Sequence, residues 1–308
     1  MNEKKHQPIK ITPHLYQLGI QNFPAYLSMG EQGMLIEGGT SATSDIIVQQ
    51  IDMLGIDPLK ISYMVLPHTH PDHVGAVPRI RKQWPHLKIV AGEVAAKFLS
   101  KDSFVKQFTP TDEWVIDILI KKNVIAQRPA PLDEYKFNAD MVVTEGDTID
   151  LGGGILWKVY HTPGHSPDHI ALFEEKEGTL TIGDITGYFD PDKNAFWPNY
   201  FVSLEDYCNS IRKLATLPAK RGLLSHNGVI EGDVNKYLKK AMRATETFHK
   251  DLLSRIDKGE DKKDICTERT DWVYAFAPLA PYKSMLSLNN LLCNITVAER
   301  EKDLFYFP

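Results

Sequence analysis

Three imidazoles and one carboxylate are crowded into the segment Pro67-His68-Thr69-His70-Pro71-Asp72-His73. Because side chains alternate along an extended segment, His68 and His70 leave the chain on the same side and can bind one ion. Asp72 and His73 come at the turn into the next element and are placed for a second ion. Imidazole and carboxylate are ligands of zinc, iron and manganese. The spacing therefore predicts a metal site rather than a solvated polar turn.

Three more polar side chains stand where predicted strands end: His165 after a Pro-Gly turn, Asp184 after Gly183, and His226 after Ser225. Each alone is a weak signal, because a single histidine at a strand end is more often structural. Together with the first cluster they make five histidines and two aspartates. That inventory suits two ions that share a bridging carboxylate. The candidate ligands are His68, His70, Asp72, His73, His165, Asp184 and His226.

The elements that must position these ligands are visible in the apolar pattern. The run 60–66 is apolar and rich in β-branched residues, which predicts a buried strand directly before the first cluster. Val74, Val77, Ile80 and Trp84 recur at helical spacing, so a helix is expected after it. Loops at strand ends are where a rigid scaffold presents chemistry.

Strands and helices alternate along much of the chain, which predicts an α/β layered fold. Further strands are expected at 15–18, 26–29, 34–36, 87–91, 141–144, 148–151, 155–160, 169–173, 179–182 and 223–225. Helices are expected over 44–54, 93–101, 203–214, 234–256, 264–276 and 283–300. The segment 102–137 has a different character and is interpreted as a helical insertion. It either packs near a substrate pocket or is a surface elaboration.

Composition narrows the class of protein. The chain has 308 residues with a net charge of −5 and no long basic run, which argues against a nucleic-acid partner. The three cysteines, Cys208, Cys266 and Cys293, show no short spacing, so we expect reduced thiols and a cytoplasmic protein. The first ten residues lack the apolar core of a signal peptide, and no apolar run is long enough to cross a membrane.

The ordered set His-x-His-x-Asp-His, Thr-Pro-Gly-His-Ser, Gly-Asp and a last His resembles the metallo-β-lactamase superfamily over roughly residues 10–230. The resemblance implies an αββα sandwich of two sheets with helices outside. It implies a metal-binding domain over 1–230, with the insertion at about 102–137, and a helical C-terminal cap over 231–308. It also implies His68, His70 and His165 on one ion, Asp72, His73 and His226 on the other, and Asp184 bridging.

A narrower pattern resembles the branch of thioesterases that act on 2-aminobenzoylacetyl-CoA. It consists of Leu35-Ile36-Glu37-Gly38-Gly39, Gly187-Tyr188-Phe189-Asp190 after Gly183-Asp184, the pair Trp197-Pro198, and Ser284-Met285 in the helical tail. Three departures from the wider superfamily are Glu37 where Asp is usual, Gly75-Ala76 where Gly-Gly is usual, and Asn227 where Gly is common. None of them removes a ligand, and Glu37 agrees with the thioesterase branch.

These patterns favour a binuclear hydrolase that attacks an acyl thioester with a metal-bridging hydroxide. Asp72 is the candidate proton carrier, and Tyr188 is the candidate donor to the substrate carbonyl. The expected cofactors are two divalent ions, with zinc favoured over iron or manganese. Lactonase or other ester hydrolase activity, an oxygen-dependent iron enzyme, and a metal-binding signalling protein with an occluded pocket are the alternatives.

The expected partner is a small molecule with an apolar or aromatic acyl group. A homodimer is also possible. Aromatic and apolar residues after Asp184 and in the tail could line its pocket. The alternative is that they pack the tail onto the sandwich. The candidate substrate-binding residues are Phe189, Phe196, Trp197, Tyr282, Met285 and Leu286.

Overall fold

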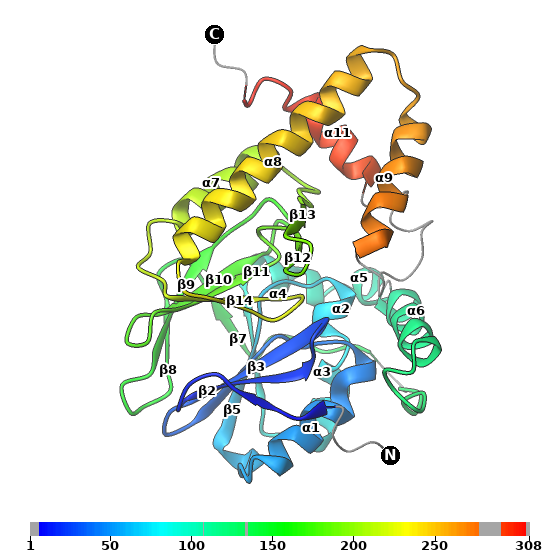
Figure 1. The fold of residues 1–308 in the computed structure, drawn as a ribbon. Helices are drawn as coiled ribbons and strands as arrows, with labels where there is room; N and C mark the ends of the chain where they lie inside the picture. The colour runs from blue at the N-terminus through cyan, green and yellow to red at the C-terminus, as the bar shows by residue number, and fades with distance from the viewer. Residues whose placement is uncertain (1–5, 107, 133–134, 277–290, 306–308) are drawn as a thin grey trace.

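The computed structural model describes residues 6–106, 108–132, 135–276 and 291–305. Two β-sheets face each other in these parts of the chain, and helices cover their outer faces (Figure 1). This is the predicted αββα sandwich.

The first sheet is built from the N-terminal half and keeps the strand order of the chain, β1 to β7. The pairs from β1 to β4 are antiparallel, and the pairs from β4 to β7 are parallel. The parallel strands bring the carboxyl end of β5, where His68 follows, to the same edge as the end of β4. The strands are β1 (Ile9–Lys10), β2 (Leu15–Ile20), β3 (Phe23–Met29), β4 (Gly33–Ile36), β5 (Ile61–Leu66), β6 (Lys88–Gly92) and β7 (Met141–Val143).

The second sheet has the order β15-β14-β11-β10-β9-β8. The turns after β8 and β10 close antiparallel hairpins, and β11 and β14 are the parallel pair of this sheet in the described residues. The small hairpin of β12 (Tyr188–Asp190) and β13 (Ala195–Trp197), and the edge strand β15, were not predicted. The strands of the sheet are β8 (Thr148–Asp150), β9 (Leu156–His161), β10 (Ile170–Glu174), β11 (Thr179–Gly183), β14 (Arg221–Leu224) and β15 (Val229–Glu231).

An apolar core joins the two sheets. It takes Tyr26, Ile36 and Val65 from the first sheet and Trp157 and Leu172 from the second, all nearly inaccessible to water. Two hydrogen bonds connect the sheets within this core. The Tyr26 hydroxyl donates to the carbonyl of Leu224 at 2.7 Å, and the Trp157 indole donates to the Ser28 hydroxyl at 3.0 Å. Burial of this surface holds the two halves of the chain at a defined separation.

The outer faces are covered by amphipathic helices. On the first sheet lie α1 (Ser44–Met53), α3 (Val77–Gln83) and α4 (Glu93–Leu99), and on the second lie α7 (Leu204–Leu214) and α8 (Val234–Asp257). The helix expected over 74–84 is instead two, α2 (Pro71–Val74) and α3. The pair Gly75-Ala76 separates them, and the amide of Ala76 donates to the carbonyl of Gly38 at 3.2 Å rather than continuing α2.

The insertion is helical, as predicted, and forms α5 (Asp102–Val105) and α6 (Phe108–Lys121). The apolar face of α6 packs Val115, Ile116 and Leu119 against Phe23 at the start of β3. The Asp112 carboxylate of α6 accepts hydrogen bonds from the Ser41 amide at 3.0 Å and from the Tyr135 hydroxyl at 2.9 Å. Helix α6 also contacts α2, which carries Asp72 and His73 of the first ligand cluster.

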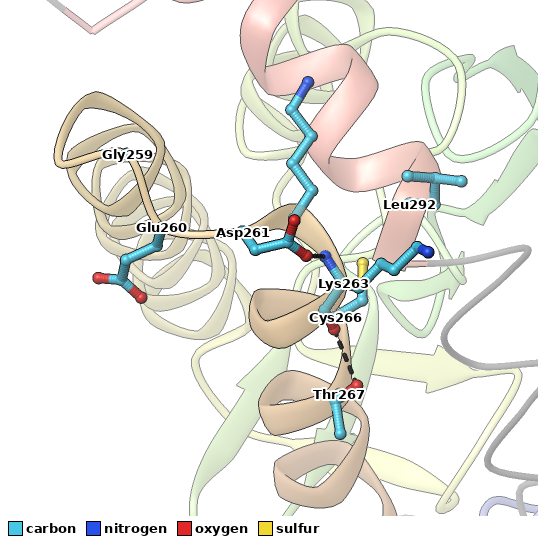
Figure 2. Close-up of a pocket in the computed structure, with 8 residues that line it drawn as sticks. Gly259, Glu260, Asp261, Lys263, Cys266, Thr267 and Leu292 are labelled. Carbon is cyan, nitrogen blue, oxygen red and sulfur yellow. Dashed lines mark hydrogen bonds between the residues drawn. The ribbon is translucent and has the colours of Figure 1, made fainter.

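After β15 the described chain is helical, in α8, α9 (Lys262–Phe276) and α11 (Leu292–Arg300). In Figure 1 these helices project from the second sheet. The turn between α8 and α9, together with Cys266 and Leu292, lines an open pocket that contains none of the candidate ligands (Figure 2). None of the helices in the described ranges is both long and apolar enough to span a membrane.

Candidate metal centre

The first predicted ligand trio comes together from both halves of the chain. The ligand atoms of His68, His70 and His165 lie within 4.8 Å of one another. His70 Nδ1 lies 3.1 Å from His68 Nε2 and 3.0 Å from His165 Nε2. A single shared proton satisfies one pair of these nitrogens, whereas a divalent cation satisfies all three. The donor set therefore fits a metal ion.

The second trio, Asp72, His73 and His226, forms a neighbouring group with the same spacing. Asp184 Oδ2 lies 3.3 Å from His73 Nε2, 3.5 Å from His226 Nε2 and 3.6 Å from His165 Nε2. One carboxylate oxygen thus faces ligands of both trios. This is the position that a bridging ligand would hold.

Hydrogen bonds behind the rings decide which nitrogen faces the cluster. His73 Nδ1 donates to Glu37 Oε2 at 2.9 Å, and His165 Nδ1 donates to the carbonyl of Asn199 at 3.0 Å. His226 Nδ1 donates to the carbonyl of Asn22 at 2.8 Å. Because carboxylate and carbonyl oxygens only accept, each of these three rings carries a proton at Nδ1, and in its neutral form it turns the Nε2 lone pair inward.

The two trios differ in charge. Burial, together with the neighbouring imidazoles, holds the pKa of His68 well below its usual range and lowers the pKa of His165 to about 4. For His73, burial also acts downward, but the carboxylates of Asp72, Glu37 and Asp184 outweigh it and raise the pKa well above the usual range. The first trio is therefore neutral at neutral pH and the second lies in a carboxylate-rich field.

Two side chains beside His165 tie the ligand loops together. Asp168, which is buried, accepts hydrogen bonds from the amide and hydroxyl of Thr69 at 2.8 Å and 2.7 Å, which links the first ligand loop to the second sheet. His169 Nε2 accepts the amide hydrogen of Asp184 at 3.2 Å. Asp168 and His169 therefore support the ligand loops without being candidate ligands themselves.

Aromatic rings stand on both sides of the ligand cluster. The Phe201 ring lies 5.1 Å from the ring of His165, and the Phe23 ring meets the His226 ring edge-on at 5.5 Å. Tyr188, the predicted carbonyl donor, lies 5.6 Å from His226, and its hydroxyl donates to Asn227 Oδ1 at 3.3 Å. The sequence analysis missed Phe23 and Phe201, because neither lies next to a ligand in sequence.

The predicted substrate-binding residues have different surroundings. Phe189 and Phe196 are buried, and their rings lie 4.5 Å apart and contact Tyr237 of α8. The Trp197 indole donates to Asn294 Oδ1 at 3.4 Å. Their contact with a substrate stays a prediction. Tyr282, Met285 and Leu286 lie outside the described residues.

An αββα sandwich with five inward-facing imidazoles and two carboxylates at one end of its sheets defines a class of metal-binding, hydrolase-like proteins. Residues 26–226 match the sequence profile of the metallo-beta-lactamase superfamily. This chain belongs to that superfamily.

Individual proteins agree with this placement. The chain is 28% identical to a beta-lactamase-like protein 2 homolog of Drosophila melanogaster over 211 residues, which are 68% of this chain and 60% of that protein. It is 23% identical to the flavo-diiron protein FprA2 of Clostridium acetobutylicum over 227 residues, 66% of this chain and 49% of that one. A metallo-beta-lactamase family protein from Thermus thermophilus shares the fold, with a TM-score of 0.68 at 19% identity and 95% coverage of both chains.

The matched stretch spans less than two thirds of each of these two curated relatives. The likeness therefore gives the fold and the family. It leaves the substrate to be argued from the site.

Proposed function

We propose that the protein is a binuclear metal-dependent hydrolase that cleaves acyl thioesters. The observation that carries the proposal is the convergence of all seven candidate ligand side chains, with Asp184 Oδ2 facing His73, His165 and His226. Two divalent ions held there would supply Lewis acidity and a nucleophilic water at neutral pH.

In this proposal His68, His70 and His165 hold the first ion, Asp72, His73 and His226 hold the second, and Asp184 contacts both. Asp72 is the proton carrier, because 25% of its side chain is exposed against 5% for Asp184, so it can reach a bound substrate. Tyr188 orients the substrate carbonyl by exchanging its 3.3 Å bond to Asn227 for one to the substrate.

The charge state of Asp72 supports a thioester over an oxygen ester. Asp72 is a ligand of the second ion in this proposal, and a carboxyl group binds a metal ion in its ionised form. An ionised carboxylate accepts a proton but has none to give. A thiolate leaving group, with a thiol pKa of about 8.5, departs without protonation, whereas an alkoxide needs an acid. Phe201, which is only partly buried, offers apolar surface for the acyl group beside His165.

Zinc is the metal we propose, and iron is the alternative. All seven donors are nitrogen or oxygen, which suits both metals. The similarity to a protein named as a flavo-diiron protein supports iron, in which case oxygen chemistry replaces hydrolysis as the second candidate function.

The test is elemental analysis of protein purified without chelator, combined with hydrolysis assays on a short and an aromatic acyl-CoA and on a matched oxygen ester and lactone. We expect two ions per chain and release of free CoA, with slower cleavage of the oxygen ester. The Asp184→Asn protein, purified in parallel, is the control for background hydrolysis. Two ions without CoA release would reject the thioesterase, and cleavage of the lactone alone would establish a lactonase.

A further inference from the structure

We propose that Asn294, in the C-terminal helix α11, is a positioning residue for His165. It acts through the segment 197–201, which lies between α11 and the ligand cluster. The inference rests on the proposed metal centre, because His165 is one of the first-ion ligands. It makes α11 part of the metal site's scaffold, although α11 supplies no ligand itself.

The Asn294 side chain is inaccessible to solvent and directs its hydrogen bonds to this segment. Its amide nitrogen donates to the carbonyls of Pro198 at 3.3 Å and Tyr200 at 3.2 Å. Its Oδ1 accepts the indole hydrogen of Trp197 at 3.4 Å. Because an indole nitrogen only donates, the amide has one orientation, and in that orientation it binds three points of the segment.

Asn199 lies between the two carbonyls that Asn294 holds. The Asn199 carbonyl points to the other side and accepts the proton of His165 Nδ1 at 3.0 Å. The next residue but one, Phe201, places its ring 5.1 Å from the His165 ring and 6.4 Å from the His70 ring. A clamp on both neighbours of Asn199 thus fixes the acceptor that orients a ligand ring.

Three further hydrogen bonds hold the chain directly after the segment, between α11 and the His165 turn. On the α11 side, the Arg300 guanidinium donates to the Val202 carbonyl, and Glu301 accepts the Glu205 amide at 2.7 Å. On the opposite side, the amide of Val202 donates to the Gly164 carbonyl at 3.2 Å. Gly164 has φ +128°, and a Cβ there would lie 2.2 Å from the Tyr207 nitrogen, so the backbone of this turn packs directly on α7 with no space for a side chain.

A purely structural role for Asn294 predicts a different outcome. The helix also packs through the buried side chains of Ile295, Val297 and Ala298. Loss of that packing would loosen the cap and lower stability without preferring one ion. A positioning role weakens the first ion selectively, because the second trio is oriented by Glu37 and Asn22 instead.

The experiment compares full-length wild type with Asn294→Leu, which is close in size and removes all three bonds, and with Asn294→Ser, which keeps one donor. Val297→Ala is the matched control for lost packing in α11. Each change is also made in two background variants. The His226→Gln background leaves the first trio intact, and the His165→Gln background leaves the second trio intact. Zinc affinity is measured by competition with a chromophoric chelator, beside the melting temperature and the absorption spectrum of the cobalt-loaded protein.

We expect Asn294→Leu to weaken zinc binding about 10-fold to 100-fold in the His226→Gln background, the range seen when a group supporting a metal ligand is removed. It should change binding less than about 3-fold in the His165→Gln background, where its target is missing. Asn294→Ser should fall between Leu and wild type and covers the case that Leu does not fold. Val297→Ala should lower the melting temperature and leave zinc affinity unchanged.

Equal zinc affinity for Asn294→Leu and wild type would overturn the inference. So would equal weakening in both backgrounds, or a loss that Val297→Ala reproduces. Failure of wild type to bind zinc or cobalt would instead reject the metal centre itself, which separates this test from that of the proposed function.

Discussion

At the scale of single residues, the candidate centre depends on which histidine nitrogen faces inward. Glu37, Asn199 and Asn22 each accept a proton from the far side of one ring, and the Nε2 lone pairs converge as a result. A residue that supplies no ligand can therefore matter to metal binding nearly as much as a ligand does.

The first prediction concerns Asp184. Asp184→Asn keeps the size of the side chain but removes the negative charge that faces both trios, so we expect loss of at least one ion and of hydrolysis. Elemental analysis and CoA release measure the two effects. His86→Gln, a change at an exposed histidine outside the cluster, should leave both unchanged. A fully loaded and fully active Asp184→Asn protein would contradict the proposed bridging role.

The second prediction concerns Glu37, whose buried carboxylate also accepts a hydrogen bond from the Ser225 hydroxyl. Glu37→Gln removes the negative charge of the group that accepts the His73 Nδ1 proton and turns one of its two oxygens into a donor, so the bond that orients His73 is weakened. We expect the affinity of the second ion to fall about 10-fold to 100-fold while the first is retained. A two-step zinc titration measures this, with Glu31→Gln on the surface as the control. Unchanged affinity for both ions would show that Glu37 serves the fold alone.

At the scale of elements, the insertion supports the site from behind. Helix α6 packs on Phe23, whose ring contacts His226, and its Asp112 holds the Ser41 amide near the first ligand loop. Of the two interpretations that the sequence leaves open, these contacts favour a position beside the candidate site over a remote surface elaboration. Burial of the Phe23 ring by α6 supplies the physical link.

The third prediction uses the hydrogen bond from Tyr135 to Asp112. Burial, with the nearby Asp112, raises the pKa of Tyr135 to about 12, so the folded protein prefers the neutral phenol. Because this pKa is raised, the group contributes stability that is fully present below about pH 10, the pKa of the unfolded chain. That stability is lost as the pH rises towards 12. Tyr135→Phe should therefore cost about 1 kcal/mol at pH 8 and less at pH 11. Urea unfolding of both proteins at the two pH values measures the difference, and a cost that does not change with pH would contradict it.

At the scale of the whole molecule, the ligands come from both sheets. His68, His70 and His73 follow β5 of the first sheet, whereas His165, Asp184 and His226 follow strands of the second. Ions bound between them would join the two halves across the end of the apolar core. Metal binding and folding stability are then linked.

The fourth prediction follows from this linkage. Removal of metal by a chelator should lower the free energy of unfolding by about 2.7 kcal/mol for each site that was filled at 100 times its Kd. The melting temperature should fall by several degrees and return when zinc is added. Thermal melts with and without chelator measure the shift, and Asp184→Asn should show a smaller one. An identical melting temperature with and without chelator would mean that the halves are held by the core alone.

The ordered ligand motifs were sufficient to establish a resemblance to the superfamily, which implies the αββα architecture, and local apolar patterns predicted most strands and helices. A strand such as β5 is indicated by its apolar run, and the ligand loops are indicated by residue type at strand ends. The split between α2 and α3 and the short strands β12, β13 and β15 were not predicted. The Ala76 amide donates to Gly38, which is far away in the chain, and a local pattern does not report such a partner. The strands β12, β13 and β15 have three residues each, which is too short for an alternating pattern to show.

The residues that surround the candidate ligands, by contrast, are known only from the tertiary structure. Phe23, Phe201 and Asn294 are ordinary packing residues in sequence, and each comes to the site by folding of segments far apart in the chain. Asn294 follows His165 by more than a hundred residues, so no spacing rule connects them. The hydrogen bonds that orient the ligand rings run mostly to backbone carbonyls, which every residue type carries. The sequence determines which side chains are present, whereas the direction of each backbone carbonyl is determined only when the chain folds.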